Sequence, residues 1–186
     1  MLRVKRSPAR LVAVGVLAAV LAINAVGNSH VPALAQGHTM PLRYTEQGTY
    51  LVGSAGSRFP FIGGSQAQVT SPAGLPAATD GFNGVLYAPA ANGCQAGPLS
   101  GAYTFGTSGD QYDFEAVATS CPVAGQPSKA TAIGSFVITG GTGRFKGAGG
   151  GGTFNANLTL LPAKPGQPLV ITYTDIGTGS IILAGQ

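Results

Sequence analysis

The densest group of ionisable side chains in the sequence is acidic: Asp110, Asp113 and Glu115, in the segment GDQYDFEAVAT. Carboxyl groups two residues apart in a strand lie on the same face, where they could exchange protons with a substrate or hold Ca²⁺ loosely. The same pattern is typical of a strand whose polar face meets water. We expect a solvated face for Asp113 and Glu115, and the acid–base alternative stays open.

Other arrangements for catalysis are missing from the sequence. His38 is the one histidine after residue 35, so a Ser-His-Asp or Cys-His arrangement has no credible base, and no GxSxG motif occurs. The sequence therefore identifies no catalytic residue, no metal site and no cofactor.

Cys94 and Cys121 are the two cysteines of the chain. A metal or redox pair would need CxxC spacing or histidines nearby, and neither is present. In an exported chain the default is one disulfide bond. We therefore predict a Cys94–Cys121 bridge.

The segment 138–154, ITGGTGRFKGAGGGGTF, is rich in glycine, and its Gly147, Gly149 and Gly152 fit GxGxxG by spacing. A phosphate-binding loop of that kind must open a helix, whose positive end holds the charge. The residues that follow, TFNANLTLL, alternate like a strand. We therefore exclude a nucleotide site here.

We interpret this segment instead as a connection between two strands. Residues 135–139 form the first strand, glycines supply backbone conformations that a tight turn needs, and Arg144 and Phe145 open the second strand. Arg144 is placed at the rim of the fold, where it could hold an anionic ligand or face water. The turn glycines are Gly140, Gly141, Gly143 and Gly147.

The N-terminus has the order of a secretory signal peptide. Its first ten residues carry four basic side chains and no acid, and an apolar run from Leu11 to Val26 follows. Ala33-Leu34-Ala35 suits signal peptidase, so we expect cleavage before Gln36, export from the cytoplasm and no stable membrane insertion afterwards. An uncleaved anchor is the alternative.

Removal of residues 1–35 neutralises the chain, because it takes four of the ten basic side chains and none of the six acidic ones. The remaining charges balance, and no basic run is left. We therefore expect no nucleic acid as a partner. Low charge and 14 aromatic residues (six Tyr and eight Phe) also argue against disorder.

Apolar and polar residues alternate along most of the remaining sequence, and no long helical pattern occurs. In QYDFEAVAT, for example, Tyr112, Phe114 and Ala116 share one face. One-sided strands separated by Gly- and Pro-rich turns indicate an all-β fold, an antiparallel barrel or sandwich of about eight to ten strands, and we favour a small barrel because closure leaves no edge strand. The expected strands are 49–52, 57–62, 66–70, 84–88, 101–105, 111–119, 130–139, 153–161, 169–176 and 179–183.

We divide the chain into a signal peptide (1–35), a flexible polar lead-in (36–47) and a single barrel domain (48–186).

The string FVITGGTGRFKGAGGGGTF resembles a strand-turn-strand signature of the allene oxide cyclase barrel-like group, which includes dirigent proteins and small secreted bacterial proteins. The segment TSGDQYDFEAVATSC is similar to a family strand after a Gly-Asp turn. The resemblance implies a small, eight-stranded antiparallel barrel, close in shape to the calycins, with a mostly apolar cavity. Relatives of this group often form homo-oligomers. The matched residues are turn and packing positions, so the resemblance carries over no catalytic residue.

Three functions follow from these observations. The first is an exported barrel that binds a small apolar molecule. The second is a cyclase or isomerase that uses the same cavity, which an inward-facing charge at Asp113, Glu115, Asp175 or Arg144 would favour. The third is a structural envelope protein with a filled barrel, favoured if no cavity of roughly 300 Å³ exists. The expected ligand-binding residues are Tyr112, Phe114, Arg144, Phe154 and Tyr173.

Overall fold

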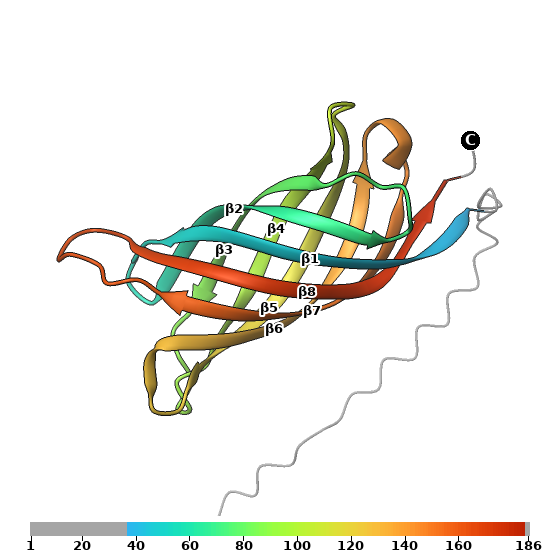
Figure 1. The fold of residues 1–186 in the computed structure, drawn as a ribbon. Coiled ribbons are helices and arrows are strands. Elements are labelled where there is room, and N and C mark those ends of the chain that lie inside the picture. Colours follow the sequence, from blue (N-terminus) through green and yellow to red (C-terminus); the bar gives the residue numbers. More distant parts are fainter. Residues whose placement is uncertain (1–36, 185–186) are drawn as a thin grey trace, which may run out of the picture. The chain divides into compact units, whose positions relative to one another are not determined.

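The computed structural model describes residues 37–184. They form a closed antiparallel barrel in which each strand pairs with its neighbours in sequence and the last strand pairs with the first (Figure 1). The predicted all-β, eight-stranded barrel is therefore confirmed. The predicted signal peptide lies outside the described residues. The strands are β1 (His38–Val52), β2 (Arg58–Ser71), β3 (Ala78–Tyr87), β4 (Gln95–Phe105), β5 (Asp110–Val123), β6 (Gln126–Gly141), β7 (Gly149–Leu160) and β8 (Leu169–Leu183).

The flexible lead-in assigned to residues 36–47 is wrong, because β1 begins at His38. Leu42, Tyr44 and Glu46 alternate with exposed residues and point into the barrel. This alternation is hard to recognise in the sequence because its third inward position is Glu46, and a charged side chain normally lies on the surface. Closure of the barrel depends on this segment, since residues 38–52 pair with β8 over their whole length.

Most strands are longer than the sequence indicates, and two of them each join two predicted segments, because glycines that resemble turns lie within them. Segments 169–176 and 179–183 are one strand, β8, which passes through Gly177 without turning. A Cβ at Gly177 would lie 2.1 Å from Cζ of Tyr44 on the paired strand, so the glycine leaves room for that ring. Segments 57–62 and 66–70 likewise join into β2.

The connection between β6 and β7 differs from the prediction in two respects. Gly140 and Gly141, predicted as turn residues, are the last residues of β6 and pair with β5. The chain turns after them, but residues Gly143–Phe145 form a short 3-10 helix, η1, and β7 begins only at Gly149. Arg144 and Phe145 therefore do not open a strand. Gly143 takes a φ of 55°, and a Cβ there would lie 1.8 Å from a carboxylate oxygen of Asp110, so only glycine fits this position.

Aromatic packing closes the end of the barrel at which η1 lies. Phe145 is 1 % exposed, and its ring centroid lies 4.8 Å from that of Phe105 and 5.6 Å from that of Tyr112. Leu42 and Ile181 are also fully buried. The turn therefore contributes the side chain that seals this end.

The Cys94–Cys121 disulfide is present. It ties the connection between β3 and β4 to β5, at the end of the barrel opposite η1. The predicted pairing is confirmed, and a disulfide is consistent with an extracellular protein.

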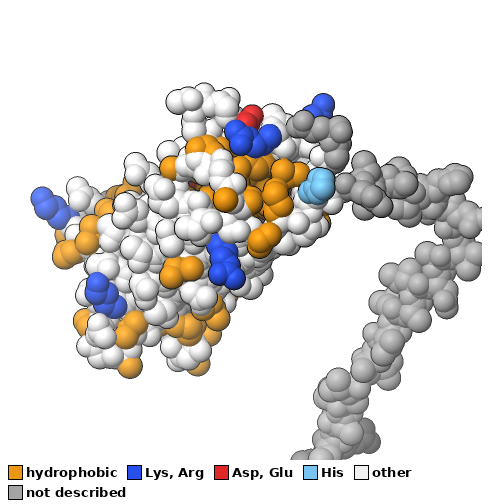
Figure 2. Space-filling view, turned by 45° about the vertical axis from the view of Figure 1, so that its right-hand side comes forward, with side chains coloured by type: hydrophobic (Ala, Val, Ile, Leu, Met, Phe, Trp, Pro, Cys, Tyr) orange, Lys and Arg blue, Asp and Glu red, His pale blue; other side chains and the backbone are white. Residues whose placement is uncertain are grey.

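The outer wall is sparsely charged. Figure 2 shows Lys and Arg side chains scattered over one face of the barrel rather than gathered into a patch. Several large apolar side chains face outward, among them Ile62, Val117, Ile133 and Ile176. Among the described residues no helix is long and apolar enough to cross a membrane.

Candidate functional site

The barrel encloses a cavity of about 100 Å³. Its walls are mostly aromatic and aliphatic, and it extends from the centre of the barrel toward the end that carries the disulfide, where Leu86, Leu99 and Ser120 lie. Of the side chains predicted to bind a ligand, four line this cavity: Tyr112, Phe114, Phe154 and Tyr173.

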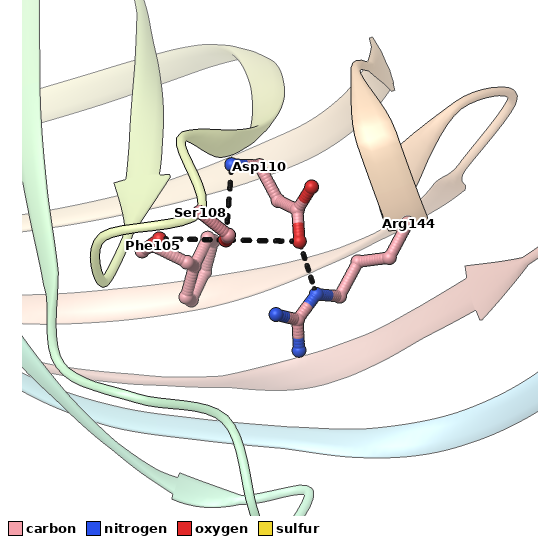
Figure 3. Close-up of polar contacts among 4 residues, drawn as sticks. All are labelled: Phe105, Ser108, Asp110 and Arg144. Carbon is pink, nitrogen blue, oxygen red and sulfur yellow. Dashed lines mark hydrogen bonds and ion pairs between the residues drawn. The ribbon is translucent and has the colours of Figure 1, made fainter.

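Arg144, the fifth predicted ligand-binding residue, lies outside the cavity. Its side chain is 38 % exposed, and its Nε donates a hydrogen bond of 2.6 Å to Oδ2 of Asp110 (Figure 3). The Ser108 hydroxyl lies 3.0 Å from the same oxygen and 3.2 Å from the carbonyl oxygen of Phe105. The hydrogen bond from Arg144 lowers the pKa of the Asp110 carboxyl. Arg144 thus fastens η1 to the start of β5.

Three carboxyl groups, from Glu46, Asp80 and Asp175, line the otherwise apolar cavity, and we call them the carboxyl cluster. Glu46 and Asp175 are 6 % and 9 % exposed. They are directly paired across β1 and β8, a position in which Cβ atoms lie roughly 4.5–5.5 Å apart. Asp80 enters from β3, where its direct partners are Ser65 on β2 and Tyr103 on β4.

Two tyrosines hold the Glu46 carboxyl. The hydroxyl of Tyr103 donates to Oε2, and the hydroxyl of Tyr173 donates to Oε1. Tyr173 and Glu46 are 127 residues apart in sequence, so only closure of the barrel brings them together. Hydrogen bonds from phenols favour the ionised form of a carboxyl group.

Two other carboxyl oxygens of the cavity wall have no partner in the described structure. They are Oδ1 of Asp80 and Oδ1 of Asp175, both of them buried. A buried polar atom without a hydrogen bond costs free energy, on the order of 1–3 kcal/mol each. Unsatisfied polar atoms at a cavity wall are therefore positions at which a ligand or water would bind.

Burial in apolar surroundings raises the pKa of every member of the carboxyl cluster. It raises the pKa of Asp175 to about 8 and that of Asp80 to about 7, with a further contribution from the charge of Glu46. Burial also raises the pKa of Glu46, although its two phenol donors act in the opposite direction. Among residues 37–184, no Lys, Arg or His lines the cavity to offset these charges. Asp175 is therefore mainly protonated at neutral pH, Asp80 titrates close to it, and Glu46 is the first of the three to ionise, because its charge contributes to the raised pKa of both aspartates.

The acids that the sequence singled out lie elsewhere. Glu115 is exposed on the outer wall, and Asp113 is half-buried there and accepts a hydrogen bond of 2.9 Å from Nε2 of Gln111. The solvated-face expectation holds for Glu115. Of the charges named in the sequence analysis, only Asp175 points inward.

Sequence reasoning missed Glu46 and Asp80. Glu46 continues the alternation of Leu42 and Tyr44, and this spacing could have placed it inside the barrel. Asp80 gives no such signal, because it stands next to Gly81 in a segment that reads as a turn.

The cluster can perform acid–base chemistry. Asp175 offers a proton and a free carboxyl oxygen, and Glu46 beside it offers a negative charge in an apolar cavity. Within residues 37–184, no group of three or more Asp, Glu, His or Cys side chains is arranged to hold a metal ion.

No protein-family model and no curated protein matches the sequence. Among solved structures the chain is similar to the pterocarpan synthase dirigent protein GePTS1, with 13 % identity and a TM-score of 0.39, over 78 % of this chain and 92 % of that one. A match of this quality assigns neither a family nor a site residue. With no family assigned, the function of the barrel has to follow from its carboxyl cluster.

Proposed function

We propose that the barrel binds a small, largely apolar molecule and moves a proton on it, as an isomerase or cyclase does. The observation that carries this proposal is the pairing of Glu46 with Asp175 in an apolar cavity, with a free oxygen on Asp175. Each buried acid lowers the free energy of unfolding, so a barrel whose interior served only for packing would be more stable without these acids.

Each member of the pair has a distinct role in the proposed reaction. Glu46, ionised and held by Tyr103 and Tyr173, accepts a proton from a carbon atom of the substrate. Asp175 donates its proton to the substrate at the other end of the shifted double bond or at an oxygen atom. The proton then returns from Glu46 to Asp175 across the β1–β8 pair, so that the reaction is balanced and the site is restored.

The reaction is tested with a small ketone that must lose and regain a proton. The purified protein is incubated with 3-cyclohexen-1-one, and conversion to the conjugated 2-cyclohexen-1-one is followed by ultraviolet absorbance. General acid–base groups contribute roughly 10²–10⁴-fold, so Asp175→Asn and Glu46→Gln should each lower the rate by at least about 100-fold. Asp113→Asn on the outer wall is the matched control, and the proposal fails if all three variants match the unmodified protein.

A second candidate is a structural barrel without a ligand. The observation in its favour is the volume of about 100 Å³, which is small beside the roughly 300–1,000 Å³ of typical ligand pockets. NMR signals of the cavity residues, recorded with and without a ligand, distinguish the two functions. Addition of 2-cyclohexen-1-one should shift signals of Phe114 and Tyr173 if the cavity binds ligands, and a spectrum that does not change supports the structural barrel.

We also propose that the protein acts outside the cytoplasm. The disulfide and the order of residues 1–35 support this location. Sequencing of the N-terminus of protein recovered from the medium or cell envelope should begin at Gln36. Recovery of the uncut chain from the membrane fraction would show that the signal segment is an anchor.

A further inference from the structure

We infer that the cavity selects an uncharged molecule with an apolar body and one acceptor oxygen, and that it excludes anions of the same size. This inference rests on the proposed function and adds the class of ligand. It follows from which polar atoms of the cavity are free, and from the sign of its charge.

The free polar atoms gather at one level of the barrel. Ser65 and Asp80 are directly paired across β2 and β3, and Asp175 lies on the far side of β1, next to Glu46. Oδ1 of both aspartates, which line the cavity, has no partner among the described residues. These carboxyl oxygens form a polar end to the cavity.

The free groups act as hydrogen-bond donors. A protonated carboxyl group carries a proton that can be donated to an oxygen atom. Burial favours this form most in Asp175, whose pKa it raises to about 8, and it raises the pKa of Asp80 to about 7. A carbonyl or ether oxygen would satisfy these donors without introducing a charge.

The negative charge of the cavity disfavours the binding of carboxylates and phosphates. Glu46 is the ionised group of the cavity, and among the described residues no cationic side chain lines the wall. An anion would therefore meet a like charge in surroundings of low dielectric constant, where repulsion is strong. It would also lose its own hydration without gaining a cationic partner.

An ammonium group is also a poor fit. It needs acceptors, and both oxygens of Glu46 already accept phenol hydrogen bonds from Tyr103 and Tyr173. The second lone pair of each oxygen can still accept a hydrogen bond, so acceptors alone do not exclude the cation. Its binding is opposed by the loss of its own hydration in an apolar cavity.

The remainder of the cavity fits an apolar body. Beyond the polar end its walls are formed by Phe82, Leu86 and Leu99, and the volume of about 100 Å³ limits the part of a ligand that is enclosed without rearrangement. For comparison, an apolar cavity of about 150 Å³ holds benzene. The expected ligand therefore places a small ring or short chain against these side chains, with its oxygen toward Asp175.

The test uses three compounds of one shape and different charge: cyclohexanone, cyclohexanecarboxylate and cyclohexylammonium. Each is titrated at pH 7 into the whole protein, and the dissociation constant is read from NMR shifts of cavity residues. Cyclohexanone should bind at least about 10-fold more tightly than either ion. Equal or tighter binding of the carboxylate or of the ammonium ion would overturn the inference and leave the proposed function standing, whereas no binding by any compound would count against the proposed function itself.

Variants separate charge from shape. Glu46→Gln removes the negative charge with little change in size, so the preference for cyclohexanone over the carboxylate should shrink severalfold. Glu115→Gln removes a charge from the outer wall and should leave the preference unchanged. If Glu46→Gln does not fold, Asp175→Val serves instead, because loss of this donor should weaken cyclohexanone binding without adding a charge to the cavity. Unchanged selectivity in Glu46→Gln, or unchanged affinity in Asp175→Val, contradicts the inference.

Discussion

Glu46 and Asp175 face each other across the β1–β8 pair, inside the barrel and without a cationic partner among the described residues. Two acids in this position share a single charge, because both cannot ionise readily at short distance in apolar surroundings. The phenols of Tyr103 and Tyr173 assign that charge to Glu46. The predictions below follow from this arrangement and from the packing that encloses it.

Stability should decrease as pH rises. Burial raises the pKa of Asp175 to about 8 and that of Asp80 to about 7, from an ordinary value of 3.8. Between those pKa values the folded protein retains protons that the unfolded chain releases. The contribution of these two groups to the free energy of unfolding is therefore fully present below about pH 4 and is lost as the pH rises toward about 8. Tyr44, Tyr103 and Tyr173 stay protonated over this range, because burial raises the pKa of each phenol.

Urea unfolding at pH 4.5 and at pH 8.5 measures this effect. The free energy of unfolding should be lower at the higher pH by on the order of a few kcal/mol. Asp175→Asn cannot ionise and should reduce the difference. A protein that is more stable at pH 8.5 would show that the carboxyl cluster is ionised in the folded state.

Removal of the Glu46 charge should change the titration of its neighbours. In Glu46→Gln the pKa of Asp175 should fall, because the charge of Glu46 contributes to raising it. The pKa of Asp80 should fall for the same reason. Carbon-13 NMR of the carboxyl groups against pH measures both values, and Glu115→Gln provides the control. An unchanged Asp175 titration would mean that the two groups do not interact.

Phe145 should contribute far more to stability than its neighbour Arg144. Phe145 is buried against Phe105 and Tyr112, and truncation of such a ring to alanine costs about 3–5 kcal/mol. Arg144 holds an exposed ion pair with Asp110, and exposed pairs contribute little. In thermal unfolding, the melting temperature should therefore fall by a large amount in Phe145→Ala and by a small amount in Arg144→Ala. The reverse order would disprove the role of Phe145 in sealing the barrel.

Gly177 should not tolerate a side chain. The Cβ of Gly177→Ala would overlap Tyr44, and overpacking of this kind typically costs about 1–3 kcal/mol. Gly81, also within a strand, has open space around it, so Gly81→Ala should be neutral or slightly stabilising. Denaturant unfolding of the two variants makes the comparison. Equal effects would mean that Tyr44 does not pack over Gly177.

Reduction of the disulfide should destabilise the barrel without abolishing it. Cys94 and Cys121 are 27 residues apart, and a bridge of this length restricts the unfolded chain by roughly 3–4 kcal/mol in the chain-entropy model. The variant with both cysteines changed to serine should unfold at a lower urea concentration and keep its far-ultraviolet circular dichroism spectrum. An unchanged midpoint would contradict the prediction.

Much of the barrel can be predicted from local pattern, because alternation reports which residues face the core. In β5 the placement of Tyr112, Phe114 and Ala116 on one face is correct, as burial shows. The errors occur where local pattern conflicts with packing. Gly177 reads as a turn, yet it lies within a strand because it accommodates Tyr44.

The acidic site was harder to predict, because an acid in a strand normally faces water. Asp113 and Glu115 look like a site by spacing, and they lie on the outer wall. Glu46 and Asp80 look like surface residues, and they line the cavity. For Glu46 the alternation with Leu42 and Tyr44 is a local signal, whereas Asp80 has none, because its placement depends on which face of its strand is turned inward.

The sequence by itself determined the all-β barrel, the pairing of Cys94 with Cys121 and the turn after Gly141, because alternation, cysteine number and glycine position are local properties. Only the tertiary structure decided which acids share one cavity. Closure between β1 and β8 joins Glu46 to Asp175 and Tyr173, residues near opposite ends of the described chain. The contact of these residues depends on strand register, which is set by packing over the whole barrel.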